Sequence, residues 1–161
     1  MQDDDGTRDT LLRSVVSIGI FGDDLDPAEV TALMGCPPSK AGRKGEPLGN
    51  SRRRDRIIPL RPVGAWILRA DERRPADFGG QVRELLGRLT PDLAVWAGLS
   101  ARFGMRIFCG VFMERFNEEL GFTAEVVALM AQRGLRLQLD IYGPVDDDDD
   151  DPAEKNVPRL N

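Results

Sequence analysis

One seven-residue sequence motif occurs twice in this chain, and this repeat constrains the fold more than any other feature. Residues 28–34 read AEVTALM and residues 124–130 read AEVVALM, so six of the seven positions are identical. Each copy follows an apolar run that is typical of a β-strand. Two strand-then-helix units around one core predict a duplicated, ferredoxin-like α+β sheet. The expected helix caps are one residue out of register, so convergence is an alternative to duplication.

Four apolar segments predict four strands, at residues 14–21, 63–70, 105–113 and 135–142. In the last segment Leu137, Leu139 and Ile141 alternate with polar residues, which is typical of a strand with one covered face. We therefore expect a four-stranded sheet, mixed or antiparallel, with the repeated helices on one face and extra helices between the repeats.

The helices are predicted from their caps and glycine stops. We expect one helix from Asp26 to Gly35, with Pro27 at its first position, and one that begins at Asp77. A third restarts at residues 90–91 and ends at Gly104, and the second copy of the repeat runs from Thr123 to Gly134. The spacing also predicts that Leu33 and Leu129 occupy equivalent buried positions.

The 161 residues are enough for one domain, which we place at residues 13–144. The flanking segments, 1–12 and 145–161, are rich in Asp, and we expect both to be disordered because like charges repel. No apolar run is long enough for a membrane span, and the N-terminus lacks a signal-peptide pattern. Cys36 and Cys109 have no metal-ligand spacing, so we expect two free thiols and a cytoplasmic location.

The chain contains no histidine. This excludes Ser-His-Asp and Cys-His catalysis and removes the commonest metal ligand. We therefore expect a protein that is not an enzyme and that uses neither a cofactor nor a metal. The alternative is acid–base chemistry on carboxylates, for which Asp140 and Glu114 near Tyr142 are the candidates.

The segment 37–62 is a long, basic, proline-rich loop. Residues 36–62 hold eight Lys or Arg residues against two acidic ones, although the whole chain has a net charge of -5. Its candidate binding residues are Arg43, Lys44, Arg52, Arg53, Arg54 and Arg56. Guanidinium groups bind phosphate or carboxylate oxygens, so the loop could hold an anionic protein or a phosphate ligand. It could also be a solvated loop neutralised by the acidic tails. The loop has no aromatic residue for base stacking, so we do not expect nucleic acid as the main partner.

A second candidate surface lies on the third and fourth strands. Alternation places Arg106, Phe108 and Phe112 on one side of the third strand, and Asp140 and Tyr142 on one side of the fourth. If these sides coincide, aromatic rings, an arginine and an aspartate form a binding patch. The alternative is that the helical segment 77–103 covers this side and buries the rings.

Several short motifs follow one another along the chain. They are GDDLDP (22–27), LMGCPP (33–38), RKGEP (43–47), WIL (66–68), LLGRL (85–89) and LDIY (139–142). In this order they resemble a bacterial family, domain of unknown function 4279. The resemblance covers about residues 14–143 and implies no activity, cofactor or catalytic residue for this chain.

The sequence thus predicts a non-catalytic protein-binding module, with an immunity-type inhibitor as one form of it. Binding of nucleic acid or a phosphate ligand through the basic loop is the alternative. The partner and the oligomeric state are left open.

Overall fold

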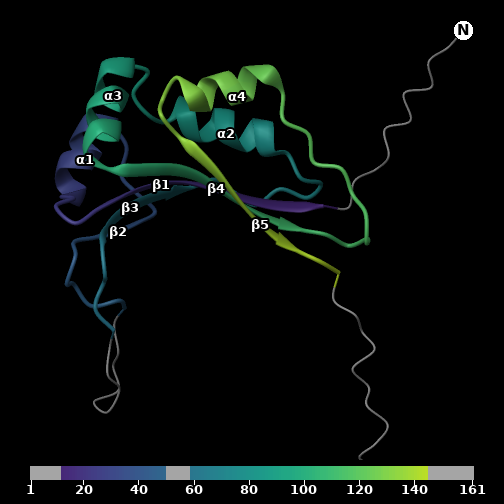
Figure 1. Ribbon diagram of the computed structural model, residues 1–161, viewed down its shortest axis with the longest axis horizontal. Coiled ribbons are helices and arrows are strands. Elements are labelled where there is room, and N and C mark those ends of the chain that lie inside the picture. Colours follow the sequence, from purple (N-terminus) through teal and green to yellow (C-terminus); the bar gives the residue numbers. More distant parts are fainter. Residues whose placement is uncertain (1–11, 50–58, 145–161) are drawn as a thin grey trace, which may run out of the picture.

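A computed structural model describes residues 12–49 and 59–144, which form one five-stranded sheet with helices on one face (Figure 1). The strand order is β2-β3-β1-β4-β5; β1 is antiparallel to both neighbours, whereas β5 is parallel to β4. The predicted α+β class and mixed sheet are confirmed, with five strands in place of four. The strands are β1 (Arg13–Gly22), β2 (Lys40–Gly42), β3 (Gly64–Arg69), β4 (Gly104–Phe112) and β5 (Arg136–Tyr142).

The additional strand, β2, lies inside the segment that we expected to be an irregular loop. It pairs with β3 in antiparallel register, Lys40 opposite Ile67, and Ser39 N donates to Ile67 O at 2.8 Å. Three residues are too few to show an alternating pattern, so backbone pairing rather than side-chain periodicity defines this strand.

The described residues form four helices, which lie between strands along the chain. They are α1 (Pro27–Met34), α2 (Phe78–Gly87), α3 (Leu93–Arg102) and α4 (Ala124–Ala131). The predicted caps of α1, α2 and α4 are confirmed, since Asp26, Asp77 and Thr123 each accept a hydrogen bond from a backbone N–H of the first turn. The expected start of α3 at residues 90–91 is wrong by two residues, because Asp92 caps it. Its expected stop at Gly104 is also wrong, because that residue already belongs to β4.

The core lies between the sheet and the helices. Alternate strand residues such as Ile18, Leu68 and Ile107 point toward the helices and are fully buried. The helix α1 packs on β3, α2 on β1 and α4 on β5, so all of the helix–sheet packing is on one face (Figure 1). The structure shows no membrane-spanning helix within the described ranges.

The repeated helices bury a different stripe from the one we expected. Val30 and Met34 of α1 are fully buried, and the equivalent Val126 and Met130 of α4 are at most 4% exposed. Leu33 is 39% exposed, so the prediction that it is buried is wrong, and Leu129 is only partly buried. Both helices are eight residues long and apolar around most of their circumference, so periodicity alone did not determine which side packs inward.

The two repeated units also connect their strands differently. After α1 the chain returns through β2 to β3, antiparallel to β1, whereas after α4 it continues directly into β5, parallel to β4. The structure therefore does not confirm the ferredoxin-like arrangement.

A buried polar network anchors the start of β1 to α2. The Ser14 hydroxyl donates to Gln81 Oε1 at 2.6 Å, and Gln81 Nε2 donates to the carbonyls of Ser14 and Asp71 at 3.1 and 2.7 Å. Leu12, which we expected in the N-terminal segment, is buried and belongs to the core. The remaining residues of the two predicted disordered segments lie outside the described residues.

Candidate functional site

The strand residues that we predicted as a binding patch share one face of the sheet. In the parallel pair of β4 and β5, Arg106 lies opposite Arg136, Gly110 opposite Asp140 and Phe112 opposite Tyr142. Their side is the one without helices, which we call the open face (Figure 1). The alternative, that residues 77–103 cover these rings, is therefore wrong. The sequence did not show that β4 and β5 are neighbours. Their pairing brings the predicted site residues of β4 next to those of β5.

Phe112 is held between two other side chains of the open face. The Arg13 guanidinium lies 3.7 Å from the centre of its ring, and Tyr142 stacks on it with the two rings 4.7 Å apart and nearly parallel. Arg13 also forms an ion pair with Glu72 at 2.7 Å. Cation–π contacts and stacking both fix the ring in place, so Phe112 presents little free aromatic surface.

Arg106 lies on the open face near the start of β4, opposite Gly19 of β1 and Arg136 of β5. Its guanidinium lies 4.5 Å from the centre of the Phe21 ring, and its Nη1 donates to Gln138 Oε1 at 2.9 Å. No carboxylate of the described residues is within ion-pair distance of Arg106. Arg106 is thus a positioned cation that no carboxylate in the described part of the chain neutralises.

Two glycines lie against the aromatic rings of Phe21 and Phe112. A Cβ at Gly19 would be 2.5 Å from the Phe21 ring, and one at Gly110 would be 3.4 Å from the Phe112 ring. The flat packing of both rings therefore depends on glycine. The sequence reasoning missed Phe21 and Arg13 as site residues, although alternation along the first strand places both on the side opposite to the buried Ile18.

The open face is strongly basic. The only acidic side chain at its strand positions is Asp140, which accepts a hydrogen bond from the Tyr142 hydroxyl at 3.3 Å. The register places these basic residues on the same face: Lys40, Arg69, Arg13, Arg106 and Arg136. A face with this charge attracts anions, whereas the chain as a whole is acidic.

An open pocket of about 850 Å³ adjoins the open face at the ends of β4 and β5. Arg13, Phe112 and Tyr142 line it together with Met113 and Ile141. Ile141 is 62% exposed but lies by alternation on the opposite side of β5 from Tyr142, so the pocket adds apolar surface beside the open face, at the end of the strand. This combination suits an amphipathic peptide better than a small ion.

Two candidate residues in the described part of the basic loop are paired within the chain. Arg43 binds Asp26 at 2.6 Å and Lys44 binds Asp23 at 2.5 Å, so acidic residues near the start of α1 neutralise these two cations. The other predicted loop residues, Arg52, Arg53, Arg54 and Arg56, lie outside the described residues.

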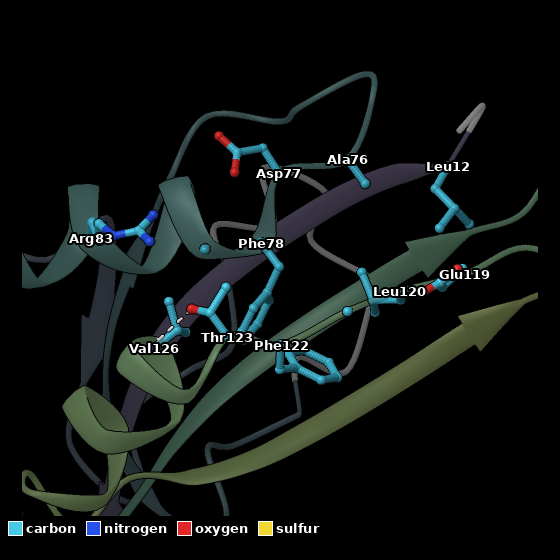
Figure 2. Close-up of a pocket in the computed structure, with 12 residues that line it drawn as sticks. Leu12, Ala76, Asp77, Phe78, Arg83, Glu119, Leu120, Phe122, Thr123 and Val126 are labelled. Atoms are coloured by element: carbon cyan, nitrogen blue, oxygen red, sulfur yellow. Dashed lines mark hydrogen bonds between the residues drawn. The ribbon is translucent and has the colours of Figure 1, made fainter. Parts of the chain in front are cut away.

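A second hollow, of about 250 Å³, lies where the N-termini of α2 and α4 approach each other (Figure 2). Phe78 points toward Phe122 in Figure 2, with the ring centres 4.8 Å apart. Asp77 and Thr123 cap the two helices, and Arg83 pairs with Glu125 at 3.1 Å. Because Asp77, Thr123 and Arg83 all have partners within the chain, these three polar side chains offer little to a ligand in this hollow.

Several other side chains that could take part in catalysis are either buried or paired within the chain. Burial raises the pKa of the Cys109 thiol to about 11, which disfavours the reactive thiolate. Arg102 beside Glu29 lowers the pKa of that carboxyl. Glu114 pairs with Arg74, and Asp140 with Tyr142. Within the described ranges no group of three Cys, Asp or Glu side chains could hold a metal ion.

Comparison with known proteins assigns the family. The model of the family Domain of unknown function (DUF4279) matches residues 11–144, so the chain belongs to this family. No curated protein and no solved structure matches the chain.

Proposed function

We propose that this DUF4279 member is a non-catalytic binding protein whose open face holds an acidic segment of a partner protein. The observation that carries the proposal is Arg106, a cation held on the open face with no described carboxylate partner. An unpaired guanidinium beside aromatic rings is the composition of a binding hot spot.

Arg106 is arranged to receive a carboxylate at low entropic cost. Its contact with Phe21 and its hydrogen bond to Gln138 hold the side chain in one orientation. A guanidinium has five N–H donors, and only one has a described partner, so a bidentate pair with an incoming Asp or Glu remains open. Preorganisation of this kind increases affinity because less freedom is lost on binding.

The state of the rings favours a protein partner over nucleic acid. Single-stranded nucleic acid binds by stacking its bases on free aromatic faces. Here Arg13 and Tyr142 occupy the two sides of Phe112, and Arg106 lies over Phe21. Phe112 and Phe21 are therefore engaged within the protein. Phe108 on the same face is partly buried and has no described ring or cation contact, so the arginines are the groups best placed to select an anionic partner.

A non-catalytic role and a cytoplasmic location complete the proposal. The absence of histidine and the raised pKa of the Cys109 thiol support the first, because they remove the most common nucleophiles and bases. Two buried free cysteines support the second, since a reducing compartment keeps thiols unpaired. An immunity-type inhibitor is one form that such a binding protein would take.

Fluorescence anisotropy with three labelled probes tests the proposal. The probes are a peptide that alternates Glu and Leu, its Lys–Leu counterpart and single-stranded oligo(dT). We expect the full-length protein to bind only the acidic peptide, and Arg106→Gln to weaken this binding by at least about tenfold, because a charged hydrogen-bond pair is lost. Arg115→Gln, which removes an exposed arginine in the loop before α4, is the matched control and should change the affinity less than about twofold.

Two results would contradict the proposal. One is an acidic peptide that fails to bind at low salt, and the other is an Arg106→Gln variant that binds it as tightly as the native protein. Tight binding of oligo(dT) would favour the alternative function through the basic loop.

A further inference from the structure

The outer edge of β5 is a free strand edge within the described part of the chain, since β5 pairs only with β4. Met113 N donates to Tyr142 O at 2.9 Å, so the backbone of Tyr142 turns toward β4. Backbone groups alternate along a strand, so those of Leu137, Leu139 and Ile141 turn outward. An edge with unpaired N–H and C=O groups is a template for another strand.

The side chains of β5 are complementary to a second copy of themselves. Two identical strands can pair antiparallel around a twofold axis so that the same face of each strand points the same way. The axis then lies between one residue and the same residue of the second copy. With the axis at Gln138, Arg136 lies opposite Asp140 of the second copy, and this happens twice. The outward-turned Leu137 then exchanges backbone hydrogen bonds with Leu139 of the second copy.

Neighbouring registers lose this match. An axis at Leu139 places Asp140 opposite Gln138 of the second copy, and an axis at Leu137 places Arg136 opposite Gln138. An axis at Asp140 places two aspartates against each other, which is destabilising. Charge complementarity therefore selects the register centred on Gln138.

The helix above this edge offers a second unpartnered surface. Glu125 reaches Arg83 of α2 on one side of α4. Val127 is two residues further, about 200° around the helix axis, and thus on the side away from α2. Ala124 and Ala131 flank Val127 at helical spacing, all three are exposed, and Val127 is 47% exposed. Small residues let two helices approach closely.

We propose that two copies of this chain join their β5 edges around a twofold axis at Gln138, forming one continuous sheet with the two α4 helices side by side. The inference is independent of the proposed function, because edge pairing lies in the plane of the sheet and leaves the open face free. The dimer would join two open faces into one platform.

Charge reversal in the full-length chain tests the pairing by sedimentation. The native protein should have twice the mass of the 17.8 kDa chain. Arg136→Asp and Asp140→Arg each place like charges opposite one another, and each should weaken self-association at least about tenfold. Mixing the two variants restores both opposite-charge pairs, so the mixture should form a heterodimer. A native monomer, or a mixture that stays monomeric, would overturn the proposal.

Cysteine cross-linking tests the register. In a non-hydrogen-bonded antiparallel pair the Cα atoms are about 4.5 Å apart, within the range of a disulfide. Gln138→Cys should therefore form a covalent dimer on oxidation. Tyr142→Cys is the control, because its counterpart would lie about 27 Å away along the strands. Both native cysteines are buried, which limits background reaction. Cross-linking of Tyr142→Cys at the same rate or faster would overturn the register.

Neither outcome depends on Arg106. Loss of acidic-peptide binding with an intact dimer would count against the proposed function alone, and a monomer that binds the peptide would count against the dimer alone.

Discussion

The two faces of the sheet use the same strands for opposite purposes. On the helix-covered face Ile18, Leu68 and Ile107 are fully buried and apolar. On the open face Arg13 and Arg106 lie against aromatic rings and remain partly exposed. Because side chains alternate along a strand, one residue step separates a position that stabilises the fold from one that can meet a partner. Substitutions on the open face can therefore change its charge and its binding properties without disrupting the hydrophobic core.

The largest expected contrast is between Trp66 and Phe112. Trp66 is fully buried and its Nε1 donates to Thr31 Oγ1 at 3.0 Å, so Trp66→Ala should lower the free energy of unfolding by about 3–5 kcal/mol. Phe112→Ala on the open face should cost less than about 1.5 kcal/mol, because the ring is only partly buried. Urea unfolding measures both. Equal costs would mean that the open face is a second core.

The next effect concerns the buried polar network. Gln81→Leu keeps the side-chain volume but leaves the Asp71 carbonyl without this donor and the Ser14 hydroxyl without its acceptor, whereas the Ser14 carbonyl keeps the hydrogen bond from Arg73 N, so we expect a loss of about 2–3 kcal/mol. Ser14→Ala combined with Gln81→Leu should cost less than the sum of the single changes, since the two side chains share a hydrogen bond. Additive costs in urea unfolding would show that they act separately.

The buried Cys109 on the helix-covered face predicts that the folding stability decreases at alkaline pH. The pKa of Cys109 is raised in the folded state to about 11, so this thiol favours folding below its ordinary pKa, and the contribution is lost as the pH rises. By pH 10 the loss should be about 1 kcal/mol, on the scale of one pKa unit. Comparison of unfolding between pH 8 and pH 10 for the native protein and Cys109→Ala isolates the effect. An equally steep decline in both proteins would assign it to other groups.

The smallest single effect is expected at Leu33 in α1. Leu33→Ala should cost less than about 1 kcal/mol because Leu33 is exposed, whereas Met34→Ala, one residue further, should cost about 2–5 kcal/mol. Thermal and urea unfolding of the pair measure which stripe of α1 packs inward. A high cost at Leu33 would restore the buried position that the repeat alone predicts.

Local signals in the sequence determined the elements of this protein. Alternating apolar residues located β1, β3, β4 and β5, and short polar side chains located the starts of α1, α2 and α4, because both act over a few neighbouring residues. The same alternation showed that Arg106, Phe108 and Phe112 share one side of their strand. The family, too, was indicated by short motifs in order.

Only the tertiary structure decided which elements are neighbours. The order of the strands, the parallel pairing of β5 with β4 and the short β2 depend on backbone pairing between residues far apart in the sequence. The packing of the helices on one face left the other face open, and the pairing of β4 with β1 brought Arg106 next to Phe21. Periodicity fixes the side of a strand on which a residue lies, but what covers that side is set by the packing of the whole chain.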